Sequence, residues 1–222
     1  SAYKMAGVDT DYEATTFEYA LEEVRRGLHV HIREGSAAHN LKDIVEGIVR
    51  TGIDTEYFSF CTDDKHIEDI LRDGHIDYSV KMAVKLGLDP IRAIKMATIN
   101  TAKCYGLKHL GAISPGFQAD FVVLDNLTDL NVTDVFYKGK RLNEDAPIRV
   151  RPCSHVLKHT VHLDKVKAER FLLPISKKKT HVIEIHAGQI TTTDLTISLP
   201  PTLNFEPFGG YSKIAAVERH HN

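Results

Sequence analysis

The feature that most constrains the fold of this chain is a strand, a polar loop and an amphipathic helix that follow one another twice. The first such unit spans residues 28–50, and the second begins at residue 57. In both, a short apolar run passes into a polar segment, at 33–36 and at 62–66, before helical periodicity begins. Two successive units of this kind predict an α/β fold with a parallel sheet or barrel. Both polar segments should lie where the carboxyl ends of the strands meet, and that edge is therefore the candidate site.

Other elements are predicted on either side of these units. A capping box, Thr15 with Glu18, predicts a helix before the first unit. After the second unit we expect a helix over 78–86 and another that begins at the cap Asp89, has Pro90 in its first turn and runs to about residue 105. Beyond Gly106 the pattern changes to short strands. They are expected at 121–124 and 132–137, joined through a turn at 138–140, and in a second β-rich region at 181–186, 190–199 and 211–217.

Composition and charge narrow the classes of function. The formal net charge is -2 over 222 residues, which gives no electrostatic support for binding nucleic acid or an anionic membrane. No segment reaches the ~18 apolar residues that a membrane span requires. The three cysteines, Cys61, Cys104 and Cys153, lack CxxC spacing, which argues against a disulfide framework or a thiolate zinc site. We therefore expect a cytoplasmic protein that acts on a small molecule.

Three blocks of sequence carry a family resemblance. They are residues 99–125, which include the run LGAISPGFQADFVVLD; the words IREGSAA at 32–38, FCTDD at 60–64 and GHID at 74–77; and IEIHAGQITT at 183–192 with IAAVERHH at 214–221. The first block resembles the stretch by which metal-dependent amidohydrolases leave their barrel and return to a flanking β-sandwich. The second and third are similar to the adenine deaminase family in particular. Together they cover essentially the whole chain.

The resemblance implies a division of the chain into three parts. These are the last portion of a TIM-type (β/α)8 barrel over 1–106, a β-sandwich return segment over 107–150, and part of a mixed, β-rich C-terminal domain over 151–222. The His-x-His pair that the family has on its first barrel strand, and the ligands on its fourth and fifth strands, are not in this sequence. We therefore expect the chain to begin near the sixth strand and to end inside the last domain. We also expect a homo-oligomer, or a barrel completed by the missing portion.

The activity that the resemblance implies is hydrolysis of adenine to hypoxanthine and ammonia, a step of purine salvage. The family uses a metal ion to activate water, and manganese or iron is the metal that the resemblance implies. Two alternatives stay open. One is another amidohydrolase, which acts on a cyclic amide or a different aminopurine. The other is a non-catalytic, amidohydrolase-like scaffold or subunit.

Asp63 and Asp64 are the candidate catalytic residues. From the residues alone, two aspartates after a strand are most often a helix N-cap with a solvated neighbour. By resemblance, Asp63 corresponds to the aspartate of the eighth barrel strand that contacts metal and moves protons. Asp64 is the lesser candidate, and either caps the next helix or orients Asp63.

Arg33, Glu34 and Ser36 are the candidate substrate-binding residues. A donor fork, a carboxylate and a hydroxyl after the preceding strand could meet the edge of a purine. The alternative is an internal salt bridge between Arg33 and Glu34 that only shapes the loop. His29 and His31, two apart on the same strand, could chelate a metal, although a packed or hydrogen-bonded role is favoured.

Tyr12 is a departure from the family pattern. The resemblance places a histidine ligand of the sixth strand at this position. A phenol with a pKa of ~10 is a poor ligand at neutral pH. Either Glu13 or Asp11 substitutes for it, or one metal position is weakened, or the activity has been lost.

Overall fold

The computed structural model describes residues 2–142, 152–163 and 165–220. The chain divides into two compact units, and each is described by itself. The described residues of the first unit are 2–142 and 186–191, and those of the second lie within 152–185 and 192–220. The expected boundary between the second and third parts of the chain, at residue 150, lies outside the described residues.

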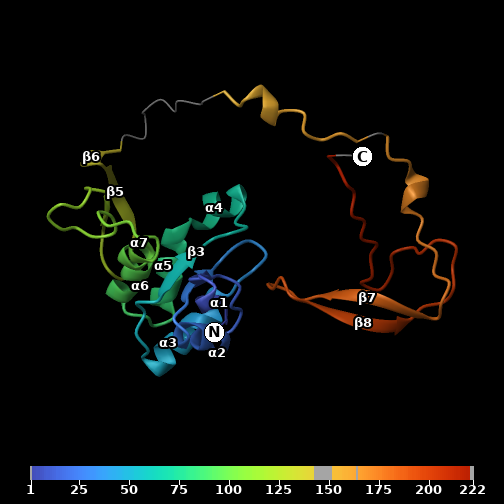
Figure 1. Cartoon of the computed structure of the whole chain (residues 1–222), viewed down its shortest axis with the longest axis horizontal. Helices are drawn as coiled ribbons and strands as arrows, with labels where there is room; N and C mark the ends of the chain where they lie inside the picture. The colour runs from blue at the N-terminus through green and yellow to red at the C-terminus, as the bar shows by residue number, and fades with distance from the viewer. Residues whose placement is uncertain (1, 143–151, 164, 221–222) are drawn as a thin grey trace. The chain divides into compact units, whose positions relative to one another are not determined.

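Helices and parallel strands alternate in the first half of the first unit, which continues with several successive helices and an antiparallel sheet (Figure 1). In chain order its elements are α1 (Ala2–Met5), β1 (Thr10–Asp11), α2 (Phe17–Arg25), β2 (His29–Arg33), α3 (Leu41–Thr51), β3 (Phe58–Cys61), α4 (Ile67–Asp73), α5 (Ile76–Lys85), α6 (Pro90–Ala97), α7 (Ile99–Cys104), β4 (Phe121–Leu124), β5 (Val132–Tyr137) and β6 (Lys140–Arg141). None of the helices in the described part of the chain is long and apolar enough to cross a membrane.

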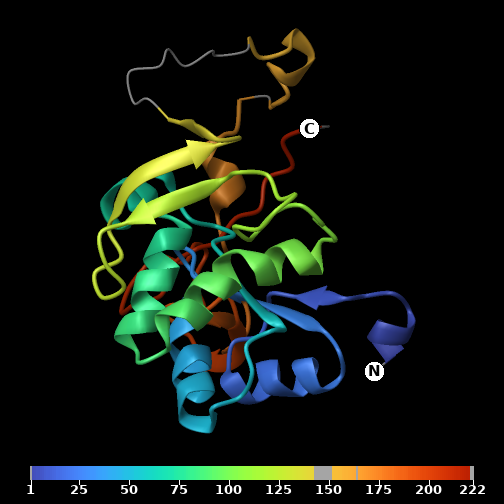
Figure 2. The same cartoon turned by 90° about the vertical axis from the view of Figure 1, so that its left-hand side faces the viewer.

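Strands β1, β2 and β3 form a parallel sheet in that order, with β2 in the centre. This confirms the α/β prediction. Val30 and Ile32 of β2 pack in the core with residues of α2 and α3, which lie on one side of the sheet (Figure 2). Because side chains alternate along a strand, His29, His31 and Arg33 lie on the opposite face. They are also buried, so all five residues of β2 are enclosed.

Two predicted helix boundaries were wrong. The N-cap of α2 is Thr16, whose side chain accepts a hydrogen bond from the backbone N–H of Tyr19, so the expected cap at Thr15 is one residue too early. The single helix expected from Pro90 to about residue 105 ends at Thr98 and restarts as α7. The break turns Asn100 toward β3, where its amide donates to two backbone carbonyls at 2.7 and 3.1 Å. Asp89 caps α6 as predicted, with Pro90 in the first turn.

The segment after α7 forms a small antiparallel sheet in the order β4-β5-β6. The predicted strands at 121–124 and 132–137 are confirmed. Lys138 and Gly139 both have positive φ and make the tight turn between β5 and β6. This sheet belongs to the first unit, and Leu130 of the loop before β5 is buried in the core of that unit.

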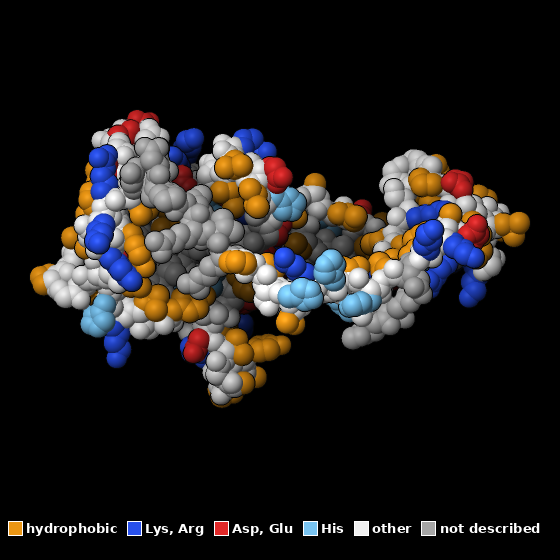
Figure 3. Space-filling view, turned by 90° about the horizontal axis from the view of Figure 1, so that it is seen from above, with side chains coloured by type: hydrophobic (Ala, Val, Ile, Leu, Met, Phe, Trp, Pro, Cys, Tyr) orange, Lys and Arg blue, Asp and Glu red, His pale blue; other side chains and the backbone are white. Residues whose placement is uncertain are grey.

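The second unit holds two short 3-10 helices, His155–Leu157 and Ala168–Phe171, and the antiparallel strands β7 (Lys179–Ile185) and β8 (Thr192–Ser198). Its core is small and consists of Ile175, Leu199 and Phe205, with Ile197 packed against them. Many hydrophobic side chains stay at the surface of the face drawn in Figure 3. The strand predicted at 211–217 was wrong. Among the described residues this segment forms only an isolated bridge, between Phe208 and Tyr211, because no neighbouring strand pairs with the rest of it.

Candidate functional site

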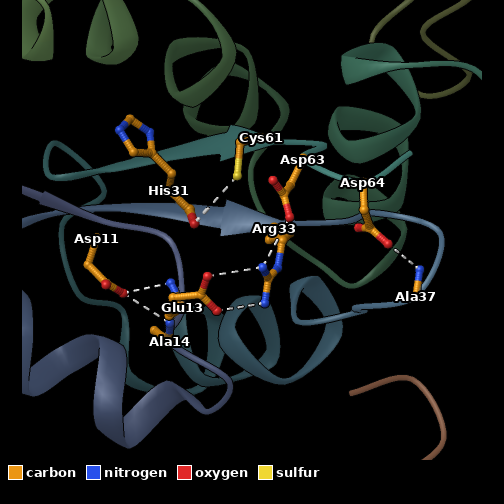
Figure 4. Close-up of polar contacts among 9 residues, drawn as sticks. All are labelled: Asp11, Glu13, Ala14, His31, Arg33, Ala37, Cys61, Asp63 and Asp64. Carbon is orange, nitrogen blue, oxygen red and sulfur yellow. Dashed lines mark hydrogen bonds and ion pairs between the residues drawn. The ribbon is translucent and has the colours of Figure 1, made fainter. Parts of the chain in front are cut away.

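Charged side chains from three strand ends meet at the carboxyl edge of the parallel sheet (Figure 4). Arg33 is the last residue of β2, while Glu13 follows β1 and Asp63 follows β3. The guanidinium donates from Nη1 and Nη2 to the two carboxylate oxygens of Glu13, at 3.3 and 3.0 Å. Its Nη1 also donates to Oδ2 of Asp63 at 3.2 Å. The two polar loops therefore lie at one edge, as the sequence predicted.

Burial is unequal within this charged group. The Arg33 side chain is 2% exposed, whereas those of Glu13 and Asp63 are 47% and 41% exposed. A buried guanidinium is tolerated when it is paired and hydrogen-bonded, and here the two carboxylates provide both. Partial burial also raises the pKa of the neighbouring Cys61 thiol to about 12, so this cysteine is neutral at physiological pH. Asp63 has φ of 47°, a left-handed conformation that aspartate adopts more readily than most residues.

Asp64 binds the loop that follows β2. Its Oδ2 accepts a hydrogen bond from the backbone N–H of Ala37 at 2.7 Å. Its Oδ1 is buried and has no hydrogen-bond partner among the described residues. The carboxylate lies directly against Gly35, since a Cβ at that glycine would stand 2.7 Å from Cγ of Asp64. The N-cap of the next helix is His66, so the prediction that Asp64 caps that helix was wrong.

Glu34 and Ser36 also make contacts within the protein. Oε1 of Glu34 lies 2.7 Å from Nδ1 of His39, whereas Arg33 pairs with Glu13 and Asp63, so the alternative of an Arg33–Glu34 salt bridge was wrong. The Ser36 hydroxyl accepts from the backbone N–H of His66 at 2.8 Å and donates to Asp69. That donated hydrogen bond is the main cause that lowers the pKa of Asp69. Hydrogen bonds of Ser36 therefore connect the loop after β2 to the segment after β3.

His29 and His31 are held by hydrogen bonds on the face of β2 opposite Val30 and Ile32. Both bind the hydroxyl of Ser59 on β3, through Nε2 of His29 at 2.9 Å and Nδ1 of His31 at 2.5 Å. The Nε2 of His31 also contacts the hydroxyl of Tyr105 at 3.1 Å. Burial lowers the pKa of His29 to about 4 and that of His31 in the same direction. The favoured hydrogen-bonded role is confirmed, whereas no pattern in the sequence indicated that Ser59 joins the two rings.

The residues around Tyr12 shape the loop after β1. Tyr12 is 45% exposed, and its ring centroid lies 5.7 Å from Cζ of Arg33. Oδ2 of Asp11 accepts from the backbone N–H groups of Glu13 and Ala14 at 2.8 and 3.0 Å. Asp11 also faces Glu23 of α2. Burial, together with the negative charge of Asp11, raises the pKa of Glu23 to about 7.

Glu23 is a residue of this site region that was not predicted from the sequence. The signal was present, because Phe17, Ala20 and Glu23 follow one another at spacings of three on α2 and all three are buried. A carboxylate on the apolar side of a helix indicates a special environment.

The described residues do not by themselves form a metal site. Nowhere in the described part of the chain are three or more His, Cys, Asp or Glu side chains grouped so that they could hold a metal ion. Asp63 can supply one oxygen ligand, but its Oδ2 is paired with Arg33. A cavity of about 360 Å³, lined by Asp9, His29 and Tyr57 among others, lies at the amino ends of the strands, away from Asp63.

A parallel sheet with charged side chains at the carboxyl ends of its strands is typical of α/β enzymes. The sequence comparison gives the family. The model of the amidohydrolase family matches residues 3–142, and the chain belongs to that family.

Curated relatives match almost the whole chain. It is 49% identical over 221 residues to an adenine deaminase of Desulfitobacterium hafniense, covering 99% of this chain and 39% of the relative. An adenine deaminase of Petrotoga mobilis is 38% identical over 229 residues, covering 99% of this chain and 40% of the relative. The chain thus spans about two fifths of the length of these relatives. A solved structure, a beta-aspartyl dipeptidase of Fervidobacterium islandicum, aligns with a TM-score of 0.48 and 20% identity over 65% of this chain and 41% of its own.

Proposed function

We propose that this chain is part of an adenine deaminase, which hydrolyses adenine to hypoxanthine and ammonia. The observation that carries the proposal is the Asp63 carboxylate. It lies at the end of a parallel strand, partly exposed, with one oxygen fixed by a buried arginine. Similarity to adenine deaminases over 99% of the chain supports the choice of substrate.

The proposed role of Asp63 is to hold and move a proton. Replacement of an amino group by oxygen needs water to lose a proton and the departing nitrogen to gain one, and one carboxylate can serve both needs. Within the described residues only Oδ2 of Asp63 is hydrogen-bonded, to Arg33. We therefore assign the proton to Oδ1.

A divalent metal, manganese or iron, is part of the proposal. When bound, such an ion lowers the pKa of water toward 7 and so supplies hydroxide at neutral pH. Asp63 fits as one hard oxygen ligand, which suits manganese. The described residues do not supply the other ligands, so no step is assigned to the metal.

The loops beside Asp63 are the proposed substrate side of the site. Arg33 ends β2, Glu34 and Ser36 lie in the loop that follows it, and Asp64 supports that loop through Ala37. Because Glu34 and Ser36 are bonded to His39, His66 and Asp69, we expect them to act mainly by fixing the shape of the loop.

The organisation of the chain is proposed on the same basis. We propose a barrel segment over 1–106, a β-sandwich return over 107–150 and part of a C-terminal domain over 151–222. The barrel would be completed by other residues of the protein or within a homo-oligomer. A cytoplasmic location is proposed from the spacing of the three cysteines.

The test is Asp63→Asn in the full-length natural protein, with Glu46→Gln, an exposed carboxylate on α3, as the control. Formation of hypoxanthine from adenine is measured. We expect Asp63→Asn to lower kcat by about 100-fold or more, in line with the size of general acid–base effects, and the control to match the wild type. Hydrolysis of guanine or hydantoins without hydrolysis of adenine would favour another amidohydrolase. Neither activity, with well below one metal ion per subunit, would favour the scaffold.

A further inference from the structure

The arginine between the two exposed carboxylates has no obvious place in binding adenine. We propose that Arg33 is a positioning residue, which fixes Asp63 and Glu13 at the strand ends and does not itself contact the substrate. The inference rests on the proposed function, since the carboxylate it positions is the one assigned to proton transfer.

Access to the guanidinium is the first argument. The Arg33 side chain is 2% exposed, and both Nη atoms are bonded to carboxylates. The two carboxylates occupy three of the five guanidinium N–H groups, and a purine could bond these three only after displacing Glu13 or Asp63. The other two N–H groups, on Nε and Nη2, belong to a side chain that is 2% exposed, so they are also closed to a ligand.

Rigidity of the arginine is the second argument. Arg33 ends the central strand, opposite Cys61 in the parallel register, and its carbonyl accepts from the backbone N–H of Asn40 at 3.0 Å. Both carboxylate oxygens of Glu13 accept hydrogen bonds from the guanidinium, and the ring of Tyr12 lies against the same guanidinium. Because these contacts hold the guanidinium in place, its hydrogen bond from Nη1 also fixes the position of the Asp63 carboxylate.

The need of Asp63 for a fixed partner is the third argument. Asp63 lies in a loop, is 41% exposed, and has no side-chain hydrogen bond within the described residues other than that to Arg33. Without the guanidinium, two carboxylates would repel each other at the same edge. A proton-transfer group must be held within a fraction of an ångström of its working position, so Arg33 would act through kcat.

The experiment uses Arg33→Lys and Arg33→Met in the full-length natural protein, with Arg50→Met, an exposed arginine of α3, as the control. The first readout is a crystal structure of each variant without substrate. We expect Asp63 to take other rotamers in Arg33→Met and to be partly restored in Arg33→Lys, because an ammonium group can replace one hydrogen bond but not the fork. An Asp63 side chain that keeps its position in both variants would overturn the proposal.

The second readout is steady-state kinetics with adenine. Positioning predicts a 10- to 100-fold fall in kcat for Arg33→Met with KM within about threefold of the wild type, and a smaller fall for Arg33→Lys. A large rise in KM with kcat unchanged would instead assign Arg33 to substrate binding. If the wild type does not hydrolyse adenine, the proposed function fails, and the crystal structures still decide the role of Arg33. If Arg33→Met does not fold, Arg33→Lys alone gives the comparison, because lysine removes the guanidinium fork and keeps the charge.

Discussion

Gly35 and Asp64 belong to different loops, yet they pack so tightly that there is no room for a methyl group between them. A Cβ at Gly35 would overlap Oδ1 of Asp64 and would stand 2.9 Å from the carbonyl oxygen of Thr62. The glycine after β2 is therefore required by the aspartate after β3. The two loops beside Asp63 are held together by this contact and by two hydrogen bonds, Ala37–Asp64 and Ser36–His66.

The first prediction concerns this contact. Gly35→Ala should lower the free energy of unfolding by about 1–3 kcal/mol, the usual cost of overpacking. Urea unfolding of Gly35→Ala, Asp64→Ala and the double variant measures it. Because Asp64→Ala removes the overlapping carboxylate, we expect the double variant to lose less than the sum of the two single losses. Strict additivity would contradict the contact.

A second prediction concerns the packing of α2 on α3. A Cβ at Gly47 would overlap the ring of Phe17. Alanine is a better helix former than glycine by about 1 kcal/mol, so Gly47→Ala would stabilise the protein if this position of α3 were exposed. We expect a loss instead, seen as a lower Tm, and a partial recovery when Phe17→Leu is added. An increase in Tm for Gly47→Ala alone would show that the two helices can separate without cost.

The third prediction concerns the pH dependence of stability, to which two buried groups, His29 and Glu23, contribute in opposite directions. The pKa of His29 falls from 6.5 to about 4, so the unfolded chain binds the proton more tightly, and His29 makes stability fall as pH falls from 6.5 to 4. The pKa of Glu23 rises from 4.5 to about 7, so the folded chain keeps the proton, and Glu23 makes stability fall as pH rises from 4.5 to 7. The two slopes oppose each other between about pH 4.5 and 6.5.

Variants separate the two slopes. In Glu23→Gln, urea midpoints should rise with pH between 4 and 6.5, because the histidine contribution remains. In His29→Gln, the midpoints should fall over pH 4.5–7, and any residual rise should come from His31, whose pKa burial also lowers. Identical pH profiles for the two variants would contradict both assignments.

A fourth prediction concerns Ser59, which is fully buried between two imidazoles. Ser59→Ala leaves a ring nitrogen of His29 and one of His31 without this partner, and each unsatisfied buried group costs about 1–3 kcal/mol. The matched control is Ser79→Ala, because Ser79 is equally buried and its hydroxyl has no partner among the described residues. Urea unfolding should show a clear loss for Ser59→Ala and little change for Ser79→Ala. Equal losses would mean that burial of the hydroxyl, and not its bonds, sets the effect.

Local patterns in the sequence predicted the parallel sheet and most helices. The cap and proline at Asp89–Pro90 act within one turn, so their effect is visible in the sequence. The strand expected at 211–217 failed because a strand also needs a partner, which no local pattern reports.

The position of the polar segments was predicted from the sequence, but the ion pairs between their side chains were not. The polar segments after β2 and β3 lie at one edge because strand polarity requires it. The pairing of Arg33 with Glu13 and Asp63 joins residues 20 and 30 positions apart, so a local reading offered only the adjacent Glu34 as a salt-bridge partner. Glu23 lies on the buried side of α2, which the local pattern could have revealed, but the size of its pKa shift depends on burial and on Asp11 from another element.

The unequal cores of the two units have a consequence for hydrogen exchange. β2 is enclosed on both faces, so its amide protons should exchange with deuterium only when the whole first unit opens. The hairpin of β7 and β8 has exposed isoleucines, Ile183 at 61% and Ile185 at 79%, and only a few buried apolar residues support it. Its amides should become deuterated orders of magnitude sooner, so that a single exchange time course would resolve one protein into a slow and a fast population of amides.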